Sequence, residues 1–135
     1  MEYFDTNVYI YAFCNNIDDE KQKETSKKLI RESIKNHKII VSEIILYEFV
    51  FASKKLKEND NLIEQYLDYL TQFVKPTNPN INKRAIDILK RSKQYQSSFD
   101  IFHLAFAEEN SCKLITFDKG FKKLQNISKI EIDIQ

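Results

Sequence analysis

Glycine is nearly missing from this sequence. An average chain of this length would contain about nine glycines, whereas these 135 residues include one, Gly120. P-loops that cradle phosphates and GxGxxG turns that bind dinucleotides need glycine at several positions where no side chain fits. The scarcity of glycine therefore excludes both kinds of nucleotide site, and it excludes flexible Gly/Ser linkers and collagen-like sequence as well.

Cysteine and long apolar runs are also scarce. Cys14 and Cys112 are too few for a disulfide framework or a metal cage, and neither has another Cys or His at ligand spacing. We expect two reduced thiols in a cytoplasmic protein, one of them in the core. No run approaches the roughly 20 apolar residues of a membrane span. Glu2 and Asp5 stand where a secretory signal would carry lysines, so we expect no leader and no membrane partner.

The composition that remains is typical of one globular domain. Apolar residues make up 42%, and 21 Lys plus Arg stand against 20 Asp plus Glu, a formal net charge of +1. A chain of this length buries roughly two-thirds of its unfolded surface as one unit, so we expect a single domain over residues 1–135. The net charge indicates no particular partner, because local fields depend on how charges are distributed.

Short apolar runs alternate with longer helical patterns along the chain. Strands are expected at residues 1–4, 38–41, 113–116 and 130–134, with a further short one at 73–75; helices are expected at residues 7–13, 18–36, 42–57, 59–73, 80–94 and 97–110, with a short helical piece after Gly120. This alternation predicts an α/β fold, with a central parallel sheet of about four or five short strands flanked by helices on both faces. Ligands of such sheets bind beyond the carboxyl ends of the strands.

Four carboxylates occur in apolar surroundings, where acids are rarely found. Asp5 and Asp118 each follow a predicted strand, Glu48 interrupts an apolar helix, and Asp100 lies in the first turn of a later helix. An ionised carboxylate in such surroundings is costly or shifts its pKa upward unless it is paired. No Lys or Arg lies within a helical turn of Glu48 or Asp100, so the compensating charge has to come from elsewhere.

These acids are expected to converge. The carboxyl ends of parallel strands lie at one edge of the sheet, which brings Asp5 and Asp118 together, and the helix N-terminus at Asp100 favours an anion. A divalent cation with oxygen ligands is the simplest compensator for clustered carboxylates. Each acid also has a structural explanation: Asp5 as a helix cap, Asp118 as the start of a turn, Asp100 as a first-turn acid and Glu48 as an exposed residue.

Polar neighbours of the acids are candidates for supporting roles. Thr6, Asn7 and Thr116 flank the acids, where they either position substrate groups or cap local structure. His103 lies three residues after Asp100 and so on nearly the same helix face. Two interpretations of His103 remain open, a partner of the acidic site and a histidine packed in the core.

Four short motifs, in this order and at this spacing, resemble a known family. They are residues 4–7 (Phe-Asp-Thr-Asn), Ser42 followed by Glu48, Asp100 with residues 103–105 (His-Leu-Ala), and residues 116–121 (Thr-Phe-Asp-Lys-Gly-Phe). Over essentially its whole length the sequence resembles a PIN domain, and specifically the VapC-type ribonuclease toxins of prokaryotic toxin–antitoxin pairs. The resemblance implies a PIN-like parallel sheet with flanking helices and an acidic pocket.

The resemblance also implies an activity, a cofactor and partners. The activity is metal-dependent endoribonuclease hydrolysis of RNA phosphodiester bonds, with Mg²⁺ or Mn²⁺ (one or two ions) as cofactor. The acidic positions fall on Asp5, Glu48, Asp100 and Asp118. The principal metal ligands would be Asp5 and Asp100. Many relatives carry a further acid where this chain has Gly120 and Phe121, so the number of ions stays open. A small cognate antitoxin would cover the pocket, and homodimers are common in the family.

Basic and aromatic residues offer surfaces for these partners. Clusters at residues 83–93 and 119–123 would supply phosphate contacts to RNA, or would be no more than solvated faces. The candidates for RNA contacts are Lys83, Arg84, Arg91, Lys119 and Lys122. Aromatic residues at helical spacing, among them Tyr47 and Phe51, either pack in the core or form an exposed patch for a partner.

Two other classes of function remain as alternatives. The first is a catalytically silent PIN-like module that holds a partner and keeps its acids for shape. The second is a phosphotransfer protein, either a receiver domain or a haloacid-dehalogenase-like phosphatase. The phosphatase needs Asp-x-Asp after its first strand, where this chain has Asn7 as the third residue, and a receiver needs adjacent acids before Asp5.

Overall fold

A four-stranded, all-parallel sheet forms the centre of the computed structural model, which describes residues 1–92 and 97–135. The strands lie in the order β2-β1-β3-β4. Tyr3 of the central strand β1 is in register with Ile40 and Leu114 on its two neighbours. The strands are β1 Glu2–Phe4, β2 Ile39–Ile40, β3 Lys113–Thr116 and β4 Ile132–Ile134. The expected α/β fold with a parallel sheet is confirmed.

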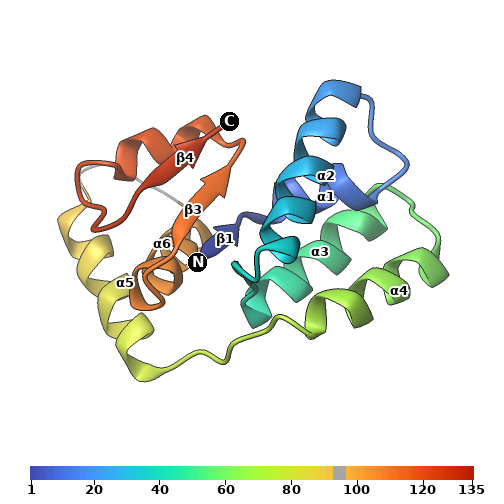
Figure 1. Cartoon of the computed structure of the whole chain (residues 1–135). Helices are drawn as coiled ribbons and strands as arrows, with labels where there is room; N and C mark the ends of the chain where they lie inside the picture. Colours follow the sequence, from blue (N-terminus) through green and yellow to red (C-terminus); the bar gives the residue numbers. More distant parts are fainter. Residues whose placement is uncertain (93–96) are drawn as a thin grey trace.

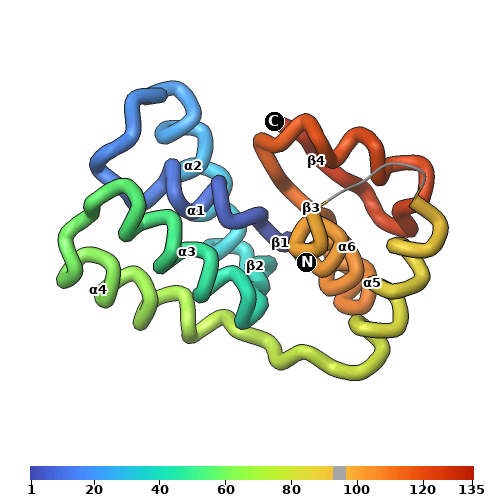
Figure 2. Tube along the Cα trace, turned by 180° about the vertical axis from the view of Figure 1, so that it is seen from behind, coloured from blue at the N-terminus to red at the C-terminus, as the bar shows by residue number. Residues whose placement is uncertain are grey.

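Six α-helices and one 3-10 helix surround the sheet in the part of the chain that is described. They are α1 Thr6–Phe13, α2 Glu20–Lys35, α3 Glu43–Lys55, α4 Asp60–Thr71, α5 Pro79–Arg91, α6 Ser98–Glu109 and the 3-10 helix η1 Lys119–Leu124. Figure 1 shows α1 to α4 on one side of β1 and α5, α6, β3 and β4 on the other, and Figure 2 shows the same division from behind. The chain passes between these halves in the segment that joins α4 to α5.

Both faces of the sheet are covered by helices because both faces are apolar. Successive side chains of a strand point to opposite faces. The Tyr3 ring packs on Phe106 of α6 with centroids 4.9 Å apart, and the Phe4 ring meets Tyr9 of α1 at 6.0 Å. All four side chains are fully buried. Helices α1 and α6 therefore cover opposite faces, as the expectation of helices on both sides required.

Most helix starts agree with the capping residues in the sequence. The side chains of Asp19, Ser42 and Asn59 accept backbone hydrogen bonds at the N-termini of α2, α3 and α4. The helix expected over residues 80–94 begins earlier, at Pro79, because proline suits the first helical position and Asn78 caps it with two accepted hydrogen bonds. Its expected last residues, Lys93 and Gln94, lie outside the described residues.

The short strand expected at residues 73–75 is wrong as a fifth member of the sheet. Val74 forms one isolated parallel bridge with Val41. The ladder cannot continue, because the residue after Val41 is Ser42, where the chain turns into α3.

The remaining expectations about thiols and membrane segments have simple outcomes. Cys14 and Cys112 are both free and both buried. Among the helices of residues 1–92 and 97–135, none has the length and apolar character needed to cross a membrane.

Candidate active site

Asp5 ends the first strand and begins the first helix, at the carboxyl edge of the sheet. It is 7% exposed, and its oxygens accept hydrogen bonds from the Thr6 amide at 2.7 Å and the Thr116 hydroxyl at 2.8 Å. Burial raises the pKa of Asp5, although nearby His103 and the two hydrogen bonds act against the rise. Asp5 is also the N-cap of α1, so its capping role holds beside any role in chemistry.

Glu48 of α3 reaches the same site through shared hydrogen-bond partners. Its Oε1 accepts the Thr6 hydroxyl at 2.7 Å and lies 2.6 Å from His103 Nε2, which is 3.9 Å from Asp5 Oδ1. Burial alone would raise the pKa of Glu48, but the contacts with His103 and Thr6 outweigh burial and lower it. Because an ionised carboxylate only accepts hydrogen bonds, Nε2 of His103 carries the proton between them.

His103 is anchored from behind by two buried hydroxyls. Its Nδ1 lies 2.5 Å from the Tyr3 hydroxyl, which lies 2.7 Å from Ser42 Oγ. Tyr3, Ser42 and His103 are all fully buried, and burial raises the pKa of Tyr3 well above its ordinary value, so the phenol keeps its proton. The two interpretations of His103 are therefore both correct: it is packed in the core and it contacts the acidic site.

The pKa of Asp100 is raised in part by the charges of the other acids. It is half-buried in the first turn of α6, and its pKa rises to about 6, first through burial and then through the charges of Asp5 and Asp118. Nearby His103 counteracts only part of this rise. A carboxyl whose pKa is raised by its acidic neighbours marks a place where positive charge is missing.

Asp118 is linked to Asp5 through Thr116. The Thr116 hydroxyl, which donates to Asp5, accepts the Asp118 amide at 2.9 Å. Asp118 is exposed, and its Oδ1 accepts the Gly120 amide at 2.8 Å at the start of η1. A Cβ at Gly120 would lie 3.0 Å from that oxygen, so the one glycine of the chain leaves room for the folded-back carboxylate.

A cleft of about 900 Å³ opens beside Asp5 and Glu48. Its described lining includes Asn7, whose Oδ1 is buried without a hydrogen-bond partner among the described residues. Of the four predicted acids, the described lining includes Asp5 and Glu48 but neither Asp100 nor Asp118. Several large apolar side chains form the walls, of which three are more than half exposed: Tyr47, Phe51 and Phe99.

The acids suit a hard divalent cation in their chemistry, although they do not form a closed cage. Within residues 1–92 and 97–135, no three His, Cys, Asp or Glu side chains are arranged as a ready-made metal site. Mg²⁺ does not need such a cage, since it keeps several waters and binds through one or two carboxylates plus substrate phosphates. The raised pKa of Asp100 and the unpaired buried oxygen of Asn7 both fit a cation at this place.

Comparison with known proteins identifies the family. The family model of the PIN domain matches residues 3–127. The chain belongs to the PIN domain family. The PIN domain is similar to a toxin–antitoxin complex from Klebsiella pneumoniae (20% identity, 94% of this chain and 92% of that one, TM-score 0.64) and to the FitAcB crystal structure from Neisseria gonorrhoeae (19% identity, 98% and 96%, TM-score 0.72). No curated protein matches it. Because the chain belongs to the PIN domain family, the receiver and phosphatase alternatives are wrong.

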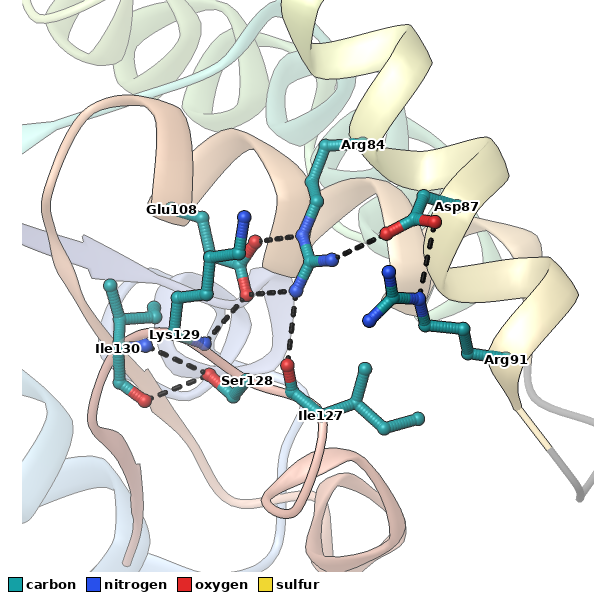
Figure 3. Close-up of polar contacts among 8 residues, drawn as sticks. All are labelled: Arg84, Asp87, Arg91, Glu108, Ile127, Ser128, Lys129 and Ile130. Carbon is teal, nitrogen blue, oxygen red and sulfur yellow. Dashed lines mark hydrogen bonds and ion pairs between the residues drawn. The ribbon is translucent and has the colours of Figure 1, made fainter.

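The candidate RNA-binding residues of this PIN domain differ in whether their charges are paired with acids. Lys83, Lys119 and Lys122 are exposed. Arg84 instead forms an ion pair with Glu108 of α6, and it donates to Asp87 at 2.8 Å and to the Ile127 carbonyl at 3.0 Å (Figure 3). Arg91 donates to the other oxygen of Asp87 at 3.2 Å. Arg84 thus ties α5 to α6 and to the loop before β4.

The sequence pattern missed Tyr3 and the second role of Ser42 in the PIN domain. Tyr3 belongs to an apolar strand, where an aromatic residue is typical, and Ser42 is fully explained as a helix cap. The available signal was that a buried tyrosine hydroxyl needs a hydrogen-bond partner. Local sequence could not name that partner, because His103 lies 100 residues away.

Proposed function

We propose that this chain is a metal-dependent endoribonuclease, the toxin of a prokaryotic toxin–antitoxin pair of the VapC type. The observation that carries the proposal is the mutual effect of the acids: the charges of Asp5 and Asp118 help to raise the pKa of Asp100 to about 6. These carboxylates come from separate elements, and their effect on the pKa of Asp100 supports a shared site at the carboxyl edge of the sheet. Membership of the PIN domain family and the two structural neighbours support this conclusion.

Each acid has a distinct part in the proposed reaction. Asp5 and Asp100 are the principal ligands of Mg²⁺ or Mn²⁺, and Asp118 contributes from the exposed side. Glu48, fixed through Oε1, offers its other oxygen to the cation or to the attacking water. When bound, the cation supplies the charge that lowers the pKa of that water and stabilises the leaving oxygen.

The supporting polar groups shape this site. Thr116 and Thr6 hold the carboxylates of Asp5 and Glu48 in fixed directions through their hydroxyls. Asn7 offers its unpaired Oδ1 to a water or a cation at the cleft.

RNA contacts are proposed for the free lysines. Lys119 and Lys122 lie on η1 directly after Asp118, and Lys83 is exposed on α5. Lysines neutralise backbone phosphates and release counterions, which gives salt-dependent affinity. Arg84 and Arg91 have a smaller part in this surface, because their charges are already paired with acids.

An antitoxin would occupy the apolar cleft. Tyr47 and Phe51 project from α3 with 67% and 68% of their surface exposed, and Phe99 completes the patch at 51%. An amphipathic segment with an apolar face for these rings and a basic residue for Asp5 and Glu48 fits the cleft. One structural neighbour is a toxin–antitoxin complex, which supports this partner. We also propose a homodimer as a second assembly, because homodimers are common in the family.

The test is sequencing of RNA ends after expression of the wild type and of the Asp5→Asn variant. Asparagine keeps the shape of the side chain and can still accept the Thr6 amide, so the variant should fold. We expect new 5′ ends at defined positions with the wild type and none with the variant. Purified protein should cleave the same RNA with Mn²⁺ and lose this activity in EDTA. Equal cleavage by both proteins would refute the site.

A silent binding module is the second candidate, favoured by the lack of a ready-made metal cage in the described residues. It predicts no heat of Mn²⁺ binding in calorimetry and unchanged affinity for an antitoxin in the Asp100→Asn variant. The nuclease predicts measurable Mn²⁺ binding that the same substitution removes.

A further inference from the structure

A continuous chain of buried hydrogen bonds runs from the N-cap of α3 to the acidic site. It passes from Ser42 through the Tyr3 hydroxyl to Nδ1 of His103, and from Nε2 of His103 to Oε1 of Glu48. Ser42, Tyr3 and His103 are all fully buried. At this depth a hydrogen that finds no acceptor costs free energy, so each hydrogen of the chain is expected to be paired.

Counting donors and acceptors leaves one arrangement of the hydrogens. Ser42 Oγ already accepts the Ile45 amide as a helix cap, so its own hydrogen finds an acceptor among the described residues only in the Tyr3 oxygen. The Tyr3 hydrogen then points to Nδ1 of His103, which accepts it. The only remaining ring hydrogen is on Nε2, and it is donated to Glu48. With the opposite direction, the Ser42 hydrogen would be left unpaired in the core.

We propose that Tyr3 and His103 are positioning residues for Glu48: Tyr3 holds His103 in the tautomer protonated at Nε2, and His103 with Thr6 fixes Oε1 of Glu48. Two donors are thereby directed at one oxygen of this carboxylate, at 2.6 and 2.7 Å. The other oxygen, Oε2, has no protein donor in the described part of the chain and is left for water or a cation. Groups that orient a ligand or base in this way commonly change affinity or rate 10- to 100-fold when removed.

The tautomer can be measured directly, because the chain contains two histidines. His37 is exposed and serves as an internal reference beside the buried His103. Long-range ¹H–¹⁵N NMR of the wild type, metal-free at pH 8, should show His103 protonated at Nε2 and unprotonated at Nδ1. A proton on Nδ1, alone or together with one on Nε2, would overturn the inference.

Variants test the consequence for the site. Tyr3→Phe removes one hydroxyl and keeps the ring on Phe106. Its matched control is Tyr9→Phe, since the Tyr9 hydroxyl is equally buried but has no partner among the described residues. We expect Tyr3→Phe to lower kcat about tenfold with little change in KM and to broaden or shift the His103 ¹⁵N signals. We expect Tyr9→Phe to change neither quantity.

A conservative replacement separates positioning from folding. His103→Gln keeps an Nε2 donor for Glu48 but cannot also reach Tyr3, whereas His103→Ala removes both contacts. We expect Mn²⁺ affinity, measured by calorimetry, to fall about 10- to 100-fold in His103→Ala and to recover in part in His103→Gln. Equal affinity in all three proteins, or Tyr3→Phe behaving like Tyr9→Phe, would refute the positioning role.

This inference rests on the proposed function, but its failure can be told apart from a failure of that function. The tautomer is read from the NMR spectrum, and Mn²⁺ affinity is read without any RNA. A wild type that binds Mn²⁺ and shows the expected tautomer but cleaves no RNA contradicts the ribonuclease and upholds the positioning chain. A wild type that cleaves RNA but has His103 in the other tautomer upholds the ribonuclease and contradicts the positioning chain.

Discussion

Replacing Asp100 by asparagine should stabilise the metal-free protein while it removes the function. Burial and the charges of Asp5 and Asp118 raise the pKa of Asp100 from 3.8 to about 6, so its ionised form is disfavoured in the folded state. Above pH 6 the folded protein carries this penalty in full. The penalty shrinks as the pH falls from 6 towards 4, and it vanishes below about pH 4, where the carboxyl is protonated in the folded and the unfolded chain alike.

The size of the effect follows from the shift. Two pKa units correspond to about 3 kcal/mol, and because Asp100 is only half-buried, solvent screening reduces this to about 1.5 kcal/mol. Losing a negative charge in the first turn of α6 offsets roughly 0.5 kcal/mol of the gain. We therefore expect Asp100→Asn to raise the free energy of unfolding at pH 7.5 by about 1 kcal/mol, or Tm by about 4 °C.

Urea unfolding followed by circular dichroism in EDTA measures this change. The matched control is Asp68→Asn, because Asp68 is an exposed acid of α4 whose substitution should stay within about 0.5 kcal/mol. The gain of Asp100→Asn should disappear at pH 4, and Mn²⁺ should raise the Tm of the wild type but not that of the variant. A variant that is less stable than the wild type at pH 7.5, or a gain that persists at pH 4, would refute the reasoning.

Three further predictions follow from the same contacts. Arg84→Met should lower the free energy of unfolding by about 3 kcal/mol in urea titrations, because it leaves Glu108, 5% exposed at its side chain, without its charged partner. A change below about 1 kcal/mol would contradict this role. RNA cleavage should fall as the pH drops through about 6, where Asp100 of the metal-free protein takes up a proton, and a flat profile from pH 5 to 8 would count against its ligand role. Cys14 and Cys112 are buried, so both thiols should resist DTNB in the native protein and react fully in urea, and fast native reaction would contradict their burial.

The positions of the acids were predictable because they follow from general rules of the fold. Asp5 and Asp118 follow strands that the apolar pattern marked clearly, and parallel strands share one carboxyl edge. Asp100 and Glu48 were singled out because acids without a nearby cation are rare in apolar helices. In the structure, the charges of Asp5 and Asp118 contribute to the raised pKa of Asp100, which supports the predicted site.

Partners that are distant in sequence could not be predicted. A tyrosine at position 3 reads as an ordinary strand residue, and nothing local links it to His103 across the sheet. The basic run around Arg84 predicted either an RNA contact or a solvated face, whereas Arg84 pairs with Glu108 of another helix. The start of α5 was missed since Asn80 looked like a cap, while Asn78 with Pro79 is the better cap.

The claim that four carboxylates form one cation site is tested most directly by anomalous diffraction from a crystal soaked in Mn²⁺. We predict a manganese peak within about 2.5 Å of carboxylate oxygens of both Asp5 and Asp100. Peaks confined to other surface acids, with none between these two residues, would contradict the account.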